Sequence, residues 1–210
     1  MQLVGILQIR SYDKIKEFLH QEHVGRFATI DSNGYPQIIP MNFVFLNDAV
    51  YMHSHPRGEK IENFRANQKA GFEVDRELEF LPSYFEDPKN ASLADTLYIS
   101  VVMKGIASLV TDVEEKTKAL NGLMEKYQPE GGYDPISSGM RVLDSVAVIK
   151  VVPKTLHGKY KIGQHLSQID RVDLAQKIFK RNSPSAKQTL KTMGFEVTPQ
   201  GLKMVDEPVW

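Results

Sequence analysis

The spacing of apolar residues changes from helical to alternating near residue 24. Before that point, Ile15, Phe18 and Leu19 fall on one face of a helix over YDKIKEFLHQE, and Ser11 stands where it can cap this helix. After it, GRFATI and PQIIPMNFVFL alternate as half-buried strands do, and the turn DSNGY between them contains an Asn-Gly pair. The pattern predicts a short helix followed by a β-hairpin.

More strands and helices are expected farther along the chain. The predicted strands are AVYMHSH, AGFEVD, TLYISVVMKGIASLVT and RVLDSVAVIKVVP, and the predicted helices are EKIENFRAN and VEEKTKALNGLMEKY. Gly105 marks a bend in the longest strand, and residues 76–95, which are polar and contain two prolines, predict a long loop. Asp112 and Glu115 have the spacing of a capping box at the start of the second helix.

This order of elements predicts a mainly β fold. About six strands follow one another in meander order, without a regular alternation of strand and helix and without a G-x-G-x-x-G motif after a strand. Pro36 and Pro40 lack an amide hydrogen, so their strand is expected at an edge, a bulge or a barrel rim. A small antiparallel barrel with helices packed outside it fits these observations better than a dinucleotide-binding doubly wound fold.

The last fifty residues differ in character from the strands before them. IDRVDLAQKIFKRN and SPSAKQTLKTMG predict two short helices, the second with Ser183 as cap, Pro184 at its first position and Gly194 as its stop. We expect residues 1–160 to form the barrel domain and residues 161–210 a helical C-terminal extension. Two helices around a short turn also fit a DNA-binding helix-turn-helix, but this spacing is common and lysine-rich helix faces are usually solvated.

Composition excludes several classes of function. Lysine plus arginine equals aspartate plus glutamate, 26 each, so net charge argues against nucleic acid or an anionic membrane as partner. The absence of cysteine excludes disulfides, cysteine nucleophiles and thiolate metal sites. No apolar run approaches the roughly 18 residues of a membrane span, and the first residues lack the basic start of a signal peptide. A soluble cytoplasmic protein is the expectation.

The stretch VYMHSHPRGEK carries the clearest candidate chemistry. On a strand, His53 and His55 share one face, but a metal site needs a third ligand and none is evident in the sequence. The competing interpretation is one half-buried and one exposed histidine. Gly58 and Lys60 stand where a strand ends and a helix begins, and a helix start with nearby cations such as Arg57 suits a phosphate. An anion site here and an ordinary charged helix start remain equally open.

Together these motifs resemble the pyridoxamine 5′-phosphate oxidase-like FMN-binding split barrels, and most closely the branch that includes nitroimidazole reductases. The resemblance rests on GRFATID, then GYPQIIPMNFVF, then VYMHSHPRGEKIENFRANQKAGFEVD, followed by YISV and DVEEKTKALNGLMEKY, and it covers roughly residues 24–160. An ordered series of motifs is far more specific than any one of them. The resemblance implies a six-stranded antiparallel FMN-binding split barrel with flanking helices and a short helical tail.

The resemblance also implies roles for individual residues. Lys60 would bind the FMN phosphate, with neighbours on the same rim, and His53 matches the histidine beside the flavin, where it is the candidate catalytic residue. The remaining residues implied in cofactor binding come from the rim, from the strand that lines the isoalloxazine ring and from a later strand that approaches it: Arg26, Thr29, Met41, Asn42, Phe43, Ser54, Gly58, Tyr98, Ser100 and Val101. Without the family pattern, Met41 and Phe43 would be taken as core residues.

The implied function is an FMN-dependent oxidoreductase that passes electrons from a reduced nicotinamide to a small organic acceptor, nitro- or quinone-like. The implied assembly is a homodimer with FMN at the interface, and the 161–210 extension would pack on the barrel or on the dimer partner. The arginine and tryptophan pattern that holds pyridoxal phosphate in the true oxidases is not recognisable, which argues against pyridoxamine 5′-phosphate oxidation. The alternative function is a non-catalytic flavin- or haem-binding sensor or stress protein, with His157 or His165 as haem ligand.

Overall fold

The computed structural model describes residues 5–205, which form two compact units. The barrel unit consists of Asp13–Val74 and Val101–His157. The extension unit consists of Asp75–Ser100 and of the described residues near both ends of the chain, 5–12 and 158–205. Three long strands contribute residues to both units. The expected separation into domains at residue 160 stays a prediction.

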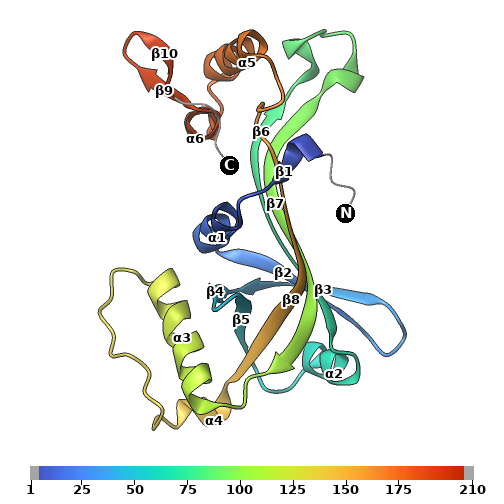
Figure 1. The fold of residues 1–210 in the computed structure, drawn as a ribbon, viewed down its shortest axis with the longest axis vertical. Helices are drawn as coiled ribbons and strands as arrows, with labels where there is room; N and C mark the ends of the chain where they lie inside the picture. The colour runs from blue at the N-terminus through green and yellow to red at the C-terminus, as the bar shows by residue number, and fades with distance from the viewer. Residues whose placement is uncertain (1–4, 206–210) are drawn as a thin grey trace. The chain divides into compact units, whose positions relative to one another are not determined.

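The barrel unit is built on a curled sheet (Figure 1) whose strands follow the order β3-β2-β6-β7-β8-β5-β4, and β1 pairs with β8 off this path. The paired strands for which a register is defined are antiparallel, as expected. The bounds are β2 Val24–Ile30, β3 Pro36–Asn42, β4 Val44–Leu46, β5 Ala49–Ser54, β6 Lys69–Leu81, β7 Asp95–Leu109 and β8 Ala147–Lys161. A mainly β split barrel with flanking helices is confirmed.

The predicted hairpin is present as β2 and β3, which pair from Val24↔Asn42 to Ile30↔Pro36. Its turn is closed by Asp31, whose side chain accepts hydrogen bonds from the backbone N–H groups of Asn33 and Tyr35, both at 2.8 Å. Gly34 lies at φ 86°, a conformation that glycine adopts without strain. Since β3 ends the path of strands, the edge position expected from its prolines is confirmed.

Four helices accompany this sheet: α1 Tyr12–Gln21, α2 Glu59–Ala66, α3 Val113–Tyr127 and α4 Val142–Ser145. The predicted inner face of α1 is confirmed, because Ile15, Phe18 and Leu19 are its buried residues. The side chain of Asp112 caps α3 by accepting from Glu115 N at 2.7 Å. The strand expected from residue 141 is wrong at its start: α4 buries Leu143, and β8 begins only at Ala147.

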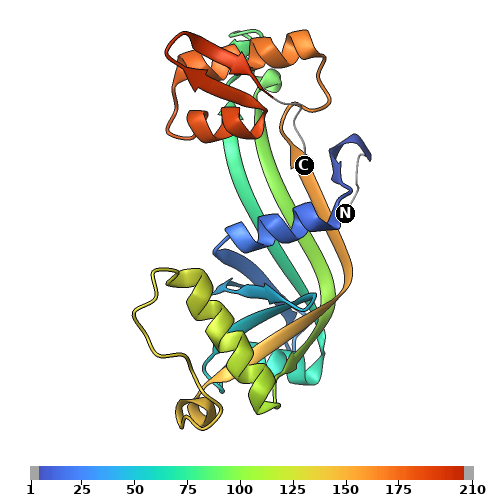
Figure 2. The same cartoon turned by 60° about the vertical axis from the view of Figure 1, so that its left-hand side comes forward.

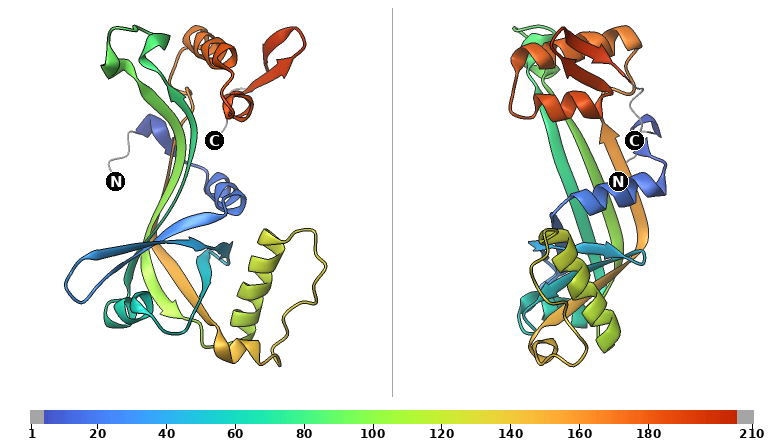
Figure 3. Two further views of the ribbon diagram at one scale, coloured as in Figure 1. Left: turned by 180° about the vertical axis from the view of Figure 1, so that it is seen from behind. Right: turned by 90° about the vertical axis from the view of Figure 1, so that its left-hand side faces the viewer.

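Helix α3 closes the core of the barrel unit by packing along β4 and β5 (Figure 3). Leu120 and Leu123 of this helix share a buried cluster with Val44, Tyr51 and Val148 of the sheet. Burial of a large apolar side chain contributes about 1.5–3 kcal/mol, so this amphipathic helix is held mainly by its apolar face. The remaining interior of the sheet is filled by aromatic and aliphatic side chains that are fully buried, among them Phe27, Phe43, Phe72, Met52 and Ile149.

The extension unit contains the last residues of β6 and β8, the first residues of β7 and the C-terminal elements (Figure 2). Its other elements are η1 Gly5–Leu7, β1 Gln8–Ile9, η2 Ser83–Phe85, η3 Ala91–Leu93, α5 Gln168–Arg181, α6 Ala186–Thr192, β9 Phe195–Thr198 and β10 Gly201–Met204. The long loop predicted for residues 76–95 is wrong at both ends, because β6 continues to Leu81 and β7 begins at Asp95. The polar sequence of residues 76–81 is not typical of a buried strand. Glu79 is nevertheless buried there, because it has partners from the C-terminal segment.

The two predicted C-terminal helices are confirmed as α5 and α6, but the start of α6 differs from the prediction. Ser185, not Ser183, is the N-cap residue, and its side chain does not cap the helix. Both hydroxyls instead donate to Glu79, at 2.6 Å from Ser183 and 2.7 Å from Ser185. Gly194 follows α6 at φ 87°, as expected of a stop, and the β9–β10 hairpin after it was not predicted.

Candidate functional site

The candidate phosphate rim is the turn between β5 and α2. Its shape is set locally, because the ring Nδ1 of His55 accepts from the backbone N–H of Arg57 at 3.1 Å. Gly58 is the N-cap of α2 at φ 135° and ψ 160°, a conformation that a side chain would strain. A Cβ at this position would meet nothing within 4 Å, so the backbone lies open to an approaching group.

The rim has the charge distribution of an anion site. The first amides of a helix, here those of Glu59 and Lys60, have no acceptor within the helix and stand at the positive end of its dipole. Arg57 and Lys60 add two cations, and within residues 5–205 neither takes part in an ion pair. The exposed side chains of Glu59 and Glu62 are the two carboxylates in this first turn and oppose them in part. The arrangement can hold a phosphate.

A buried polar contact fixes α2 against the hairpin. The side-chain amide of Asn63, which is 6% exposed, donates to Thr29 Oγ1 at 3.1 Å and to Gln37 Oε1 at 3.3 Å. Thr29 is itself buried, so it holds the helix that carries Lys60 in place. Ser54, also buried, donates to the carbonyl of His55 at 2.9 Å. Sequence reasoning missed Asn63, because nothing in a single helical asparagine signals a partner on a distant strand.

A pocket of about 230 Å³ brings His53 and Asn42 together in the barrel unit. Both residues are exposed, and the other walls are apolar side chains of α3 and its following loop, together with the ring of Tyr127. The alternation of β5 explains the position of His53, because Tyr51 on the same face contacts α3 through a 2.7 Å hydrogen bond to Glu115. The pocket can hold a small apolar group beside an imidazole and an amide.

Charges beside this pocket are paired. Lys150 Nζ lies 2.6 Å from Glu115, and this contact raises the pKa of Lys150. Hydrogen bonds from Lys150 and Tyr51 lower the pKa of Glu115, while burial is the main cause that raises the pKa of Tyr51. The carboxylate therefore stays ionised and the phenol protonated at neutral pH, and together they fasten α3 to the sheet.

Phe43 contributes a buried ring and a fixed backbone. Its ring is fully buried. The centroid of this ring lies 5.0 Å from the ring centroid of Phe72 and 3.8 Å from Lys126 Nζ. The hydroxyl of Tyr127 accepts from Phe43 N at 2.8 Å and donates to the carbonyl of His23. Burial lowers the pKa of Lys126 to about 8. The ring of Phe43 is closed to a ligand, and its backbone N–H and carbonyl both already bond to the Tyr127 hydroxyl. Neighbouring Met41 is half-buried and pairs with Gly25.

The remaining predicted site residues belong to strands β2 and β7 and not to the turn that forms the rim. Arg26 forms an exposed ion pair with Glu73 at 2.9 Å. Tyr98 and Ser100 are half-buried on the part of β7 that belongs to the extension unit, whereas the rim belongs to the barrel unit. The side chain of Val101 is fully buried. Contacts of these four residues with a cofactor stay predictions.

Comparisons with known proteins agree with this architecture. The family model of pyridoxamine 5′-phosphate oxidase matches residues 11–160. A candidate 5-nitroimidazole antibiotic resistance protein of Bacteroides thetaiotaomicron is 25% identical with a TM-score of 0.62, over 73% of this chain and 86% of that one. No protein of curated function matches the sequence.

Two further solved structures share the fold at lower identity. A flavocytochrome of Azotobacter vinelandii is 17% identical with a TM-score of 0.64, over 77% of this chain and 72% of that one. An FAD- and haem-binding protein of Mycobacterium smegmatis is 15% identical with a TM-score of 0.63, over 80% of this chain and 79% of that one. Among residues 5–205, no helix has the length and apolar character that crossing a membrane requires.

The matched family model, the curled antiparallel sheet and the solved relatives agree, and the chain belongs to the pyridoxamine 5′-phosphate oxidase family.

Proposed function

We propose that this protein is an FMN-dependent oxidoreductase that transfers electrons from a reduced nicotinamide to a small organic acceptor, nitro- or quinone-like. The observation that carries the proposal is the rim at the start of α2, where open amides, Gly58 and Lys60 form a cradle for a phosphate. Membership of the family and the flavin-binding names of the solved relatives support a flavin as the ligand.

Each part of the rim has a separate task in binding. The backbone amides at the start of α2 and the ammonium of Lys60 hold the phosphate, and Gly58 allows it to approach the backbone. Asn63 keeps the helix in register with β2 and β3, so that these donors are in place before the ligand arrives. A terminal monophosphate gains from all of these contacts, which favours FMN over riboflavin.

The pocket that contains His53 and Asn42 is the proposed acceptor site. Its apolar walls exclude water from a small organic molecule, while the imidazole and the amide supply hydrogen bonds that orient a nitro or quinone oxygen. Bound FMN supplies the redox chemistry, and the protein supplies position and electrostatics. In this scheme His53 is the candidate proton donor to the reduced acceptor, because its exposed ring lies at the mouth of the pocket.

The functional assembly in this proposal is a homodimer with the flavin at the interface. Fully buried side chains such as Phe27, Phe43 and Phe72 fill the inside of the barrel, so no space remains there for a tricyclic ring. The ring must lie outside, and a second copy would cover its apolar face. If so, FMN tightens the dimer by the same factor by which dimerisation tightens FMN. Sedimentation of apo and FMN-loaded protein over a dilution series measures this linkage.

The substitution Lys60→Ala tests the rim. A charge-assisted contact to phosphate is worth about 1.5–3 kcal/mol, so affinity for FMN should fall roughly tenfold to a hundredfold. Affinity for riboflavin should stay unchanged, because riboflavin lacks the phosphate. Fluorescence titration of the apoprotein with each flavin measures both constants.

The matched control is Arg65→Ala, which removes the same charge from the other end of α2. It should leave both affinities unchanged. Equal loss of FMN and riboflavin in Lys60→Ala would mean a damaged fold, and no loss at all would place the phosphate elsewhere. Anaerobic titration with NADH and NADPH then separates an oxidoreductase from a protein that only binds its cofactor.

A further inference from the structure

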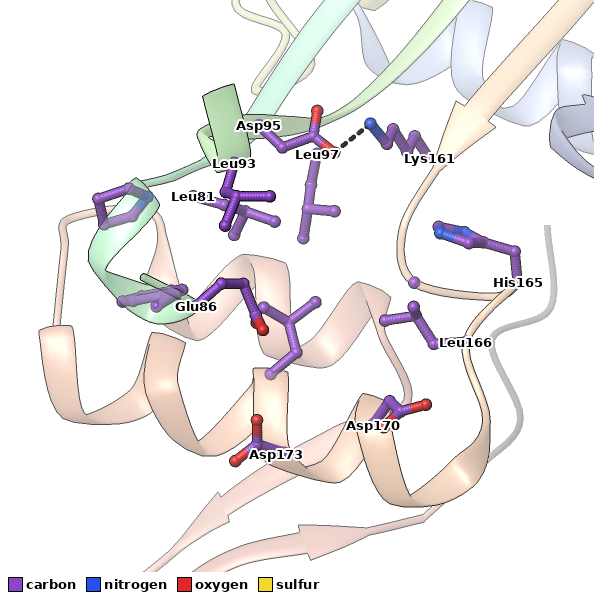
Figure 4. A pocket seen from close by; sticks show the side chains of 14 residues that line it. Leu81, Glu86, Leu93, Asp95, Leu97, Lys161, His165, Leu166, Asp170 and Asp173 are labelled. Atoms are coloured by element: carbon purple, nitrogen blue, oxygen red, sulfur yellow. Dashed lines mark hydrogen bonds and ion pairs between the residues drawn. The ribbon is translucent and has the colours of Figure 1, made fainter. Parts of the chain in front are cut away.

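The extension unit contains a second pocket, of about 300 Å³, that none of the flavin chemistry uses (Figure 4). It is lined by the end of β6, the segment with η2 and η3, the start of β7, the turn after β8 and one side of α5. Five leucines, at positions 81, 93, 97, 166 and 174, and the ring of Phe85 form its apolar walls. A volume of this size lies at the lower end of the range for small-molecule sites.

The polar groups of this pocket are mostly carboxylates. Glu86, Asp95, Asp170 and Asp173 line it, together with Lys161 and His165. Figure 4 shows Asp95 and Lys161 joined on one side and the ring of His165 extending from its turn toward the space between the walls. Asp170 and Asp173 come from α5 on the other side.

The carboxylates outnumber the cations that neutralise them. Lys161 pairs with Asp95, and Lys177 of α5 is shared between Glu86 at 2.9 Å and Asp173 at 2.8 Å. Asp170 has no ion-pair partner within residues 5–205, and its carboxylate accepts only from the hydroxyl of Ser167, at 2.7 Å. Four carboxylates therefore face two lysines and one imidazole.

The excess of carboxylates over cations favours a positively charged ligand. Burial, the largest single influence, would raise the pKa of Asp95, but the hydrogen bonds from Lys161 and from the backbone of Thr96, together with the charges of Lys161 and His165, lower the pKa, so this carboxyl is ionised at neutral pH. An anionic ligand would meet an excess of negative charge whether or not His165 is protonated. The same excess opposes the propionates of a haem, which argues against His165 as a haem ligand in this pocket.

We propose that this pocket binds a small organic cation with an apolar body, such as a primary amine on a short aromatic or branched aliphatic group. The ammonium lies against Asp170 and Asp173 at the mouth, and the apolar body lies against Leu97, Leu166 and Leu174. The site is independent of the rim at α2, because every residue that lines it belongs to the extension unit.

Three probes of one shape test the charge preference with the full-length, FMN-loaded protein. Isothermal titration with 2-phenylethylamine, 2-phenylethanol and 3-phenylpropionate compares a cation, a neutral molecule and an anion. The amine should bind at least tenfold more tightly than the anion, and added salt should weaken the amine while sparing the alcohol. An anion that binds as tightly as the amine, or an amine that does not bind, would overturn the proposal.

Variants locate the binding. Asp170→Asn keeps an acceptor for Ser167 but removes the unpaired charge, and it should weaken the amine about threefold to tenfold without changing the alcohol. Asp134→Asn, on an exposed loop of the barrel unit, removes the same charge and should have no effect. Leu93→Trp, at a partly exposed wall position, should fill the pocket and abolish binding of both probes. Retained FMN and an unchanged melting temperature show that each variant is folded, and full binding by folded Leu93→Trp would rule out this pocket.

Discussion

The two units bury a charged side chain in opposite ways. In the barrel unit, the ammonium of Lys126 lies over the ring of Phe43 and donates to the carbonyl of Leu19 at 2.9 Å. In the extension unit, the carboxylate of Glu79 is 2% exposed and accepts from Arg181 at 2.8 Å and from two serine hydroxyls. Lys126 has one backbone acceptor and the face of an aromatic ring as partners. Glu79 has an opposite charge and two hydroxyl donors.

The difference shows that the hydrogen-bond and ion-pair partners of a buried charge, more than its degree of burial, decide whether it stabilises or destabilises the fold. Lys126 lacks an adjacent carboxylate strong enough to offset burial, and its pKa falls to about 8 even though Glu22 opposes the shift. Glu79 joins β6 to the last residue of α5 and to the segment between α5 and α6, so its hydrogen bonds hold these parts of the extension unit together. We expect Glu79 to contribute stability and Lys126 to reduce it below pH 8.

The largest effect should come from Glu79→Ala. The substitution leaves Arg181, Ser183 and Ser185 without their common acceptor, and loss of one partner of a buried ion pair costs about 3–5 kcal/mol. Since the side chain of Arg181 is 31% exposed and can turn to water, the lower end of that range is expected. Denaturant unfolding measures the loss, and hydrogen exchange should show it first in α5 and α6.

The control for this prediction is Glu77→Ala, an exposed glutamate two residues earlier on the same strand. It should change the free energy of unfolding by less than about 0.5 kcal/mol. If the two variants lost similar stability, the cluster around Glu79 would not be what holds the extension unit together.

A smaller effect, with a pH signature, is expected of Lys126→Met. The folded pKa of about 8 lies below the ordinary lysine value of 10.5, so between these pH values the unfolded chain binds more protons than the folded one. Stability should therefore rise with pH in the wild type, by about 1 kcal/mol from pH 8 to pH 10 after allowance for solvent screening of a partly exposed amine. Lys126→Met should remove this rise, as denaturant unfolding at several pH values can show.

Lys118→Met is the matched control, because Lys118 is exposed on the same helix. It should keep the rise with pH. The window ends near pH 10, because Tyr51 and Tyr127, whose pKa values are raised mainly by burial, add the opposite slope above it. A wild-type stability that is flat or falls from pH 8 to pH 10 would contradict the account of Lys126.

The smallest effect is expected where the charge is exposed. Asp112→Ala removes the cap of α3 and should cost about 1 kcal/mol, since its carboxylate satisfies one free amide of the helix. Glu114→Ala, an exposed acidic residue in the same first turn, should cost only a few tenths of a kcal/mol through the helix dipole. Thermal unfolding of both variants distinguishes a hydrogen-bonded cap from charge alone.

The sequence by itself determined the features that depend on neighbouring residues. The Asn-Gly turn, the inner face of α1 and the cap at Asp112 each rest on contacts within a few positions, and all three are confirmed. The ordered motifs between residues 24 and 160 also identified the family. Gly58 lies at a positive φ, a backbone conformation that glycine adopts without strain.

Tertiary structure decided the features that join distant residues. Glu115 has the spacing of a capping box, yet its carboxylate bonds to Tyr51 and Lys150 of the sheet. The charge of Glu79 led to the prediction of a loop over residues 76–81. Its partners lie about a hundred positions later in the chain, and no local pattern indicates them. The pocket of His53 and the acidic pocket of the extension unit arise in the same way, from side chains that only the folded chain brings together. Hydrophobic periodicity records which face of an element is buried, and it carries no information about which distant polar group will satisfy a charge placed there.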